Sequence, residues 1–124
     1  MFVRQDISLA QQIVQSNHAT FELARRLPHP QNLEITPSCI VIGVPNKTAL
    51  YRVIEKLRAN DIAHELFYEP DFDMGLSAVA TVPLGQELRR KLSNYRLWHE
   101  PDAPSRVNSA VPPQVDSAAM GAMQ

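Results

Sequence analysis

The chain has 124 residues, of which 44% are hydrophobic and 20% charged, with a single cysteine and a formal net charge of −1. This length suits one small domain, and a lone cysteine excludes a disulfide scaffold. The near balance of basic and acidic residues argues against binding nucleic acid over the whole surface, although it allows a local basic face. No apolar stretch approaches the roughly 18 residues of a membrane span, and no secretory signal opens the chain. We therefore expect a soluble cytoplasmic protein without a membrane partner.

Composition divides the chain near residue 98. From residue 99 onward there is no aromatic residue, and proline, serine and alanine are frequent. Such a segment cannot bury enough apolar surface to offset its ordering entropy, so we expect a folded domain over 1–98 and a disordered tail over 99–124. Pro28 and Pro30, within the segment 28–32, predict an internal loop. Cys39 lies in an apolar run, which predicts a buried, reduced and inert thiol.

The first half of the domain opens with a short expected strand at 2–4 and a helix over about 8–26. Ser8 or Asp6 would cap this helix. Apolar residues recur along it at spacings of three, four and seven, which indicates a stripe that faces the core. The stripe consists of Ala10, Ile13, Val14, Phe21 and Ala24.

The remaining pattern completes an α/β domain. The β-branched run 38–44 predicts a strand buried on both faces, with Ile40 and Ile42 at the centre of the sheet. Asn46 would cap a second helix that ends near Asn60. The buried stripe of this helix would be Leu50, Val53, Ile54 and Leu57. Two strands and a short helix follow over 62–68, 76–82 and 84–92. The order β-α-β-α-β-β-α predicts a mixed four-stranded sheet with helices on its faces.

The first helix also carries the densest group of polar side chains. Its polar face consists of Gln11, Gln15, His18, Glu22 and Arg25. Asn17 lies within the apolar stripe, where its amide would need hydrogen-bond partners from a strand end or a loop. On composition alone, a polar helix face with a surface histidine explains this group better than a functional site does.

Carboxylates gather directly after the third expected strand, at Glu69, Asp71 and Asp73. Carboxylates at a strand end in an α/β fold often face a ligand crevice. A solvated acidic turn with Phe72 folded back on the core is the competing interpretation. The loop is too short for a calcium site, and the four histidines lack zinc-ligand spacing, so we expect no metal.

Basic residues form a third group, on the second helix and on the last helix with its exit. They are Lys47, Arg52, Lys56 and Arg58, then Arg89, Arg90, Lys91 and Arg96. Such a surface can hold phosphates, and a solvated helix face explains it nearly as well.

The opening Val3-Arg4-Gln5-Asp6, the helix with Gln15-Ser16-Asn17-His18-Ala19 and the β-α-β-β-α half that follows resemble the type II peptidyl-tRNA hydrolases, the archaeal and eukaryotic kind. In that family a short strand ending in Arg-x-Asp leads into a helix with Gln-x-x-His-Ala. The resemblance covers about residues 2–98. It implies hydrolysis of the ester that joins a peptidyl or N-blocked aminoacyl group to the 3′ end of tRNA, with no metal or cofactor.

The resemblance also implies roles for individual residues. His18 would be the general base or would orient the attacking water, with Asp71 or Glu69 as its helper. Asn17 or Gln15 would donate to the oxyanion or the ester carbonyl. The residues expected to contact substrate are Arg4, Asp6, Gln15, Asn17 and Glu69. The expected partner is the acylated 3′ end of a tRNA, and a second copy of the chain is a further candidate.

The sequence departs from the family pattern in two places. The family carries a Gly-Lys-Gly-Lys-like stretch before the helix, whereas segment 7–12 is shorter and has no lysine. The loop 69–75 lacks the family threonine. Losing one donor to an oxyanion costs on the order of 2.7–4 kcal/mol, so we expect weak activity or none. Two alternatives stay open: a non-catalytic RNA- or protein-binding module of the same fold, and a ferredoxin-like regulatory domain, which strand order would distinguish.

Overall fold

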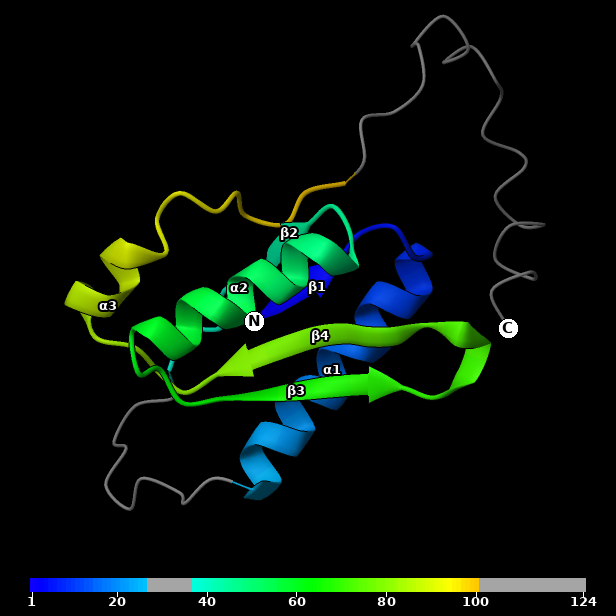
Figure 1. The fold of residues 1–124 in the computed structure, drawn as a ribbon, viewed down its shortest axis with the longest axis horizontal. Coiled ribbons are helices and arrows are strands. Elements are labelled where there is room, and N and C mark those ends of the chain that lie inside the picture. Colours follow the sequence, from blue (N-terminus) through cyan, green and yellow to red (C-terminus); the bar gives the residue numbers. More distant parts are fainter. Residues whose placement is uncertain (27–36, 101–124) are drawn as a thin grey trace, which may run out of the picture.

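The computed structural model describes residues 1–26 and 37–100 (Figure 1). The loop expected at 28–32 and the tail beyond residue 100 lie outside the described residues. The elements are, in order, β1 (Phe2–Arg4), α1 (Leu9–Arg26), β2 (Ile42–Val44), α2 (Lys47–Ala59), β3 (His64–Glu69), β4 (Gly75–Thr81) and α3 (Gln86–Lys91). A single 3-10 turn, Asp71–Asp73, connects β3 to β4. The expected β-α-β-α-β-β-α order is confirmed.

The four strands form one mixed sheet in the order β2-β1-β4-β3. β1 and β2 are parallel, and β4 is antiparallel to both β1 and β3. Because β1 and β2 pair directly, no strand splits this βαβ unit, as one would in a ferredoxin-like domain. The strand order therefore excludes that alternative. It also means that β1, β2 and β3 all end at one edge, which we call the carboxyl edge, and that β4 begins there.

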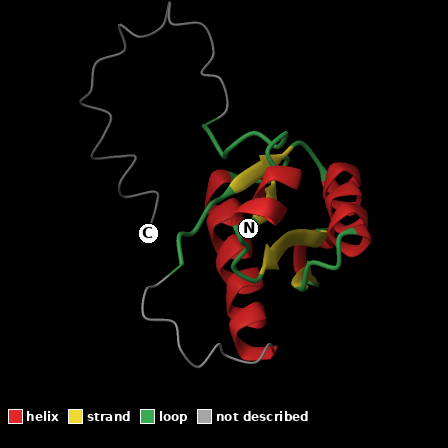
Figure 2. Cartoon of the chain, turned by 90° about the vertical axis from the view of Figure 1, so that its left-hand side faces the viewer, coloured by secondary structure: helices red, strands yellow, loops and turns green. Residues whose placement is uncertain are grey.

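Helices cover both faces of this sheet (Figure 2). On one face, α2 buries the predicted stripe, and these side chains join Phe2, Ile62 and Val79 in the larger core. Asn46 caps α2 as expected, because its side-chain oxygen accepts a hydrogen bond from the Ala49 N–H at 2.9 Å. Asn60 is the residue at the C-terminal end. The second helix is thus confirmed in its bounds, its cap and its buried side.

The helix α1 lies on the opposite face, and the prediction of which side it buries is wrong. Its buried residues are Gln12, Gln15 and Ala19. The predicted stripe residues Ala10, Ile13, Val14, Phe21 and Ala24 are all exposed. The bounds hold, and Ser8 caps the helix, since its hydroxyl oxygen accepts from the Gln11 N–H at 3.2 Å.

The polar side of α1 packs against the sheet because the facing side chains are small and the buried amides have hydrogen-bond partners. The sheet beneath it presents Val3, Ala78 and Ala80, so a helix face of small residues and flat amides approaches closely. Both ends of the Gln12 amide are paired: Nε2 donates to the Ile7 carbonyl at 3.0 Å, and Oε1 accepts from the Trp98 indole at 2.8 Å. A buried amide with its partners in place carries no desolvation penalty that would force it outward.

The second strand is shorter than expected and lies elsewhere in the sheet. Only Ile42–Val44 pair with β1, at an edge of the sheet and not at its centre. The preceding residues leave the ladder, so Cys39 is exposed, and the prediction of a buried thiol is wrong. Ile40 still packs against the larger core from outside the strand.

The outer side of β2 is covered by residues 97–99. Ile42 forms an antiparallel bridge with Leu97, and the Trp98 N–H donates to the Val41 carbonyl at 2.8 Å. The Gln5 side chain crosses β2 to donate to the His99 carbonyl at 3.0 Å. A Cβ at position 43 would overlap that Gln5 side chain, which is why the strand has Gly43 there. Residues 97–99 therefore belong to the folded domain.

The other boundaries differ from expectation by one or two residues. The expected strands at 62–68 and 76–82 are found at 64–69 and 75–81, and the last helix at 86–91. Within the described ranges, no helix is long and apolar enough to cross a membrane.

Candidate functional site

Arg4 and Asp6 form a two-point ion pair at the carboxyl edge, where β1 ends. Arg4 Nε lies 2.6 Å from Asp6 Oδ1, and Arg4 Nη2 lies 2.8 Å from Asp6 Oδ2. Arg4 Nη1 donates to the carbonyls of Met74 and Leu76 at 2.8 and 3.2 Å, so the same guanidinium ties β1 to the start of β4. The hydrogen bond from Arg4 lowers the pKa of Asp6, and the same bond raises the pKa of Arg4. The Arg4 guanidinium therefore joins Asp6 and the start of β4 to the end of β1.

The lowered pKa of Asp6 predicts a pH dependence of stability. The folded state keeps this carboxylate ionised to lower pH than the unfolded chain does, so its contribution is present above about pH 4. It is lost as pH falls through the lower folded-state pKa. We expect Asp6→Asn to flatten the fall in urea-unfolding free energy between pH 5 and pH 2, whereas Glu55→Gln, on exposed α2 surface, leaves it unchanged. An identical slope in Asp6→Asn would contradict the pairing.

Gln15 and Glu69 join α1 to the end of β3. Gln15 is fully buried, and its Nε2 donates to Glu69 Oε2 at 2.9 Å and to Gln11 Oε1 at 3.1 Å. Its Oε1 accepts from the buried Ser77 hydroxyl at 2.6 Å. Glu69 Oε1 in turn accepts from the Asp71 N–H at 3.2 Å. Every polar group of the Gln15 amide is engaged, so its arrangement positions Glu69 and offers no free donor.

His18 is exposed on the same helix, one turn beyond Gln15, and its ring stacks on a residue of β3. The ring centroids of His18 and Phe67 are 4.4 Å apart, and the planes differ by 4°. Among the described residues, no hydrogen bond is made by either ring nitrogen. Stacking fixes the ring plane while the nitrogens stay open to solvent, two residues along β3 from Glu69.

Two of the expected site residues lie apart from these groups. Asn17 is exposed on the outer side of α1, away from the sheet, so its expected place among core residues is wrong. The Asp71 side chain is exposed in the 3-10 turn, and within the described ranges no hydrogen bond joins its carboxylate to His18. In the same turn Phe72 is 79% exposed with φ of 59°, so the alternative in which it folds back on the core is also wrong.

Lys47 is the residue that sequence reasoning missed at this edge. It is the first residue of α2, and a Cβ built on Gly75 would lie 3.3 Å from its Nζ, so the ammonium group lies against the backbone there. Its charge also contributes to the lowered pKa of Asp6. Lysines of the second helix were expected only as a general basic face. The usable signal was its position directly after Asn46, because a helix that follows a parallel strand begins at the carboxyl edge.

The carboxyl edge therefore combines one ammonium group, two positioned carboxylates and a nearby solvent-accessible imidazole. Across residues 1–26 and 37–100, no cluster of three or more His, Cys, Asp or Glu side chains has the geometry of a metal site. Of these groups, an imidazole such as that of His18 can transfer a proton, and an ammonium group such as that of Lys47 can stabilise negative charge.

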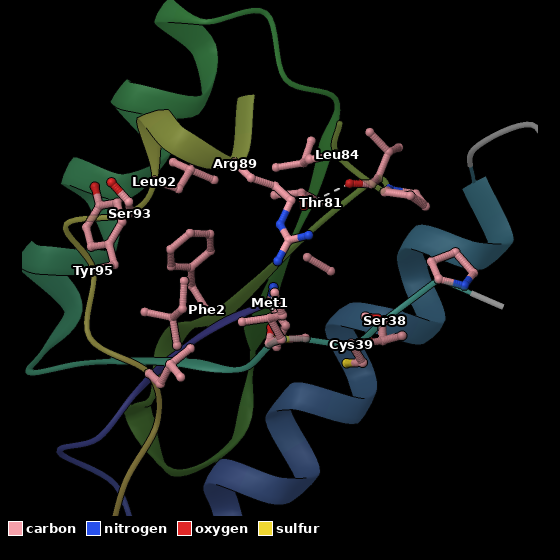
Figure 3. A pocket seen from close by; sticks show the side chains of 18 of the residues that line it. Met1, Phe2, Ser38, Cys39, Thr81, Leu84, Arg89, Leu92, Ser93 and Tyr95 are labelled. Carbon is pink, nitrogen blue, oxygen red and sulfur yellow. Dashed lines mark hydrogen bonds between the residues drawn. The ribbon is translucent and has the colours of Figure 1, made fainter. Parts of the chain in front are cut away.

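A cavity of about 970 Å³ opens at the end of the sheet opposite the carboxyl edge, where β1 begins and β4 ends. It is bounded by the start of β1, the end of β4 and the helix α3, with Phe2, Leu84, Leu92 and Tyr95 among its mostly apolar lining. Figure 3 shows the Arg89 side chain directed into it from α3, toward Met1. Of the described residues that line the cavity, two are arginines and none is acidic. None of the predicted site residues lies there.

Comparison with protein-family models, with curated proteins and with solved structures finds no match to this chain.

Proposed function

We propose that the carboxyl edge binds the acylated 3′ end of a tRNA and hydrolyses its ester, as the resemblance to type II peptidyl-tRNA hydrolases implies. The supporting observation is the ammonium group of Lys47 at Gly75, whose charge also contributes to the lowered pKa of Asp6. The sequence lacks the lysine that the family carries before its first helix. Lys47 supplies a cation from a different element, at the carboxyl edge where β4 begins between the ends of β1 and β3.

His18 and Lys47 take complementary parts in this proposal. A water molecule attacks the ester carbonyl and transfers a proton to the His18 imidazole, which acts as the general base. Lys47 stabilises the negative charge that develops on the carbonyl oxygen. Collapse of this intermediate breaks the bond between the acyl carbon and the 3′ oxygen of the tRNA, and His18 returns its proton to that departing oxygen. Gln15 acts as a positioning residue, since it holds Glu69, which pairs in the ladder with Gly75. His18 stacks on Phe67, two residues from Glu69 along β3, and Lys47 lies at Gly75.

Deacylation of N-acetyl-aminoacyl-tRNA tests the proposal. We expect Lys47→Met to lower the rate constant on the order of a hundredfold, as removal of one charge-stabilising donor does. Arg52→Met, an exposed cation of the same helix, should keep the wild-type rate. Equal rates for wild type and Lys47→Met would remove Lys47 from the reaction. A wild type that does not hydrolyse but binds tRNA with a steep salt dependence would establish the binding-module alternative, because phosphate contacts release counterions.

The cavity at the opposite edge supports a second function, binding of a small anion with an apolar body. Its volume lies in the usual range for small-molecule sites, and a guanidinium such as that of Arg89 in a mostly apolar lining suits a carboxylate head group. The observation that favours it is the Arg89 side chain directed into a cavity whose described lining holds no carboxylate.

A ligand comparison tests this second function. We expect dodecanoate to raise the melting temperature and dodecanol, which lacks the charge, to raise it much less. Arg89→Gln should remove the difference between the two ligands, whereas Arg96→Gln, outside the cavity lining, should preserve it. An equal response of the Arg89→Gln variant and the wild type to dodecanoate would rule out the assigned contact.

A further inference from the structure

The outer side of α1 is an apolar surface on a helix that has no charge over most of its length. Leu9, Ile13, Val14 and Phe21 are 49%, 59%, 42% and 65% exposed. From Leu9 to Phe21 the sequence contains no charged residue. Depletion of charge around large apolar side chains marks the centre of protein interfaces, whereas a solvated helix face normally carries charges.

The spacing of this surface is symmetric. We define the outer stripe by its five members, Ala10, Ile13, Asn17, Phe21 and Ala24, all of which are exposed. Their positions mirror one another about residue 17: 10 corresponds to 24, and 13 corresponds to 21. An interface between two copies related by a two-fold axis requires this correspondence, because residue i of one copy must face residue j of the other and the reverse.

We propose that the outer stripe pairs with the outer stripe of a second copy of this chain, the two α1 helices running antiparallel about a two-fold axis at Asn17. Ile13 then packs against Phe21 of the other copy at two equivalent places. Ala10 faces Ala24 of the other copy, and these small side chains let the helices approach closely. The two Asn17 amides meet at the axis, where each can donate to and accept from the other.

The size of the contact agrees with such a dimer. Covering the exposed parts of these side chains and their neighbours on two copies removes on the order of 1,000 Å² from water, near the lower limit for specific interfaces. An antiparallel arrangement also places the helix macrodipoles in opposition, which is favourable. Asn17 at the centre selects one register, because a shift would bury an unpaired amide against apolar side chains. The dimer does not depend on the proposed hydrolysis, since Gln15 and Glu69 face the sheet side of α1.

Sedimentation equilibrium of the full chain tests the interface. We expect the wild type to be dimeric at micromolar concentrations and both Ile13→Glu and Phe21→Glu to be monomeric with unchanged far-UV circular dichroism. Tyr51→Glu is the matched control, because Tyr51 is a comparably exposed apolar side chain, at 44%, on α2. It should remain dimeric. A wild type that is monomeric throughout, or a dimer that survives Ile13→Glu, would overturn the proposal.

Cysteine cross-linking tests the antiparallel register. The background is Cys39→Ser, which removes the exposed native thiol. Oxidation should cross-link Asn17→Cys with itself, because its Cα atoms meet at the axis and disulfides need Cα separations of less than about 7 Å. Ile13→Cys should cross-link efficiently only when mixed with Phe21→Cys. Equal self-cross-linking of Ile13→Cys would show parallel pairing, and no cross-link at position 17 would show a different surface; either result refutes the proposed dimer.

Discussion

Truncation of Leu57 to alanine is expected to lower the free energy of unfolding by about 2–5 kcal/mol. Leu57 is fully buried at the last turn of α2, in the larger core with Phe2 and Ile62. Removing its side chain loses the burial of apolar surface and leaves a cavity that the surrounding side chains fill only in part. Urea unfolding followed by far-UV circular dichroism measures the difference.

The control for this substitution is Glu55→Ala, an exposed position on the same helix. Alanine favours a helix at least as well as glutamate, so its unfolding free energy should stay within about 0.5 kcal/mol of the wild-type value. A loss of less than 1 kcal/mol in Leu57→Ala would mean that α2 is not the main cover of this sheet face, because no other helix within residues 1–26 and 37–100 buries a comparable stripe in the larger core.

Replacement of His18 by alanine should reduce hydrolysis of N-acetyl-aminoacyl-tRNA by about 10²–10⁴-fold, the usual contribution of a general base. The side chain is exposed and contacts Phe67 by stacking, so the melting temperature should change little. The rate should therefore fall without loss of folded protein. Single-turnover deacylation with excess enzyme isolates the chemical step from tRNA binding.

His99→Ala is the matched control. His99 lies beside β2, where its backbone carbonyl accepts a hydrogen bond from the Gln5 side chain. The His99→Ala variant should hydrolyse at the wild-type rate. An unchanged rate in His18→Ala would exclude this residue as the base, whatever the effect of Lys47→Met.

The spacing of apolar residues predicted the bounds and the buried side of α2, but only the bounds of α1. The difference has a physical reason. In α2 the apolar side chains and the buried side coincide, since Leu50 and Leu57 meet a sheet face that is itself apolar. In α1 the sheet offers small side chains and the Ser77 hydroxyl, so Gln12 and Gln15 pack there with their amides paired. The spacing of apolar residues shows which side of a helix is apolar, but it does not tell whether that side packs on the chain's own sheet or on another molecule.

The candidate site was predictable only where neighbouring residues in sequence define it. Arg4 and Asp6 lie two residues apart at a strand end, and the sequence placed them together. The contact between Gln15 and Glu69 joins segments 54 residues apart, which depends on strand order. Lys47 follows β2, and Gly75 begins β4, which lies on the other side of β1 in the sheet. The lysine side chain reaches across the end of β1 to Gly75, and residue spacing along the chain does not encode this arrangement.

The fluorescence of Trp98 can report on the packing of α1 against the sheet. Trp98 is the single tryptophan, and it links two parts of the fold by donating from its indole to Gln12 of α1 and from its backbone to Val41 beside β2. Its fluorescence emission therefore reports on the seam between the helix and the sheet edge. Separation of α1 from the sheet would hydrate the indole and shift the emission to longer wavelength before the larger core under α2 is exposed.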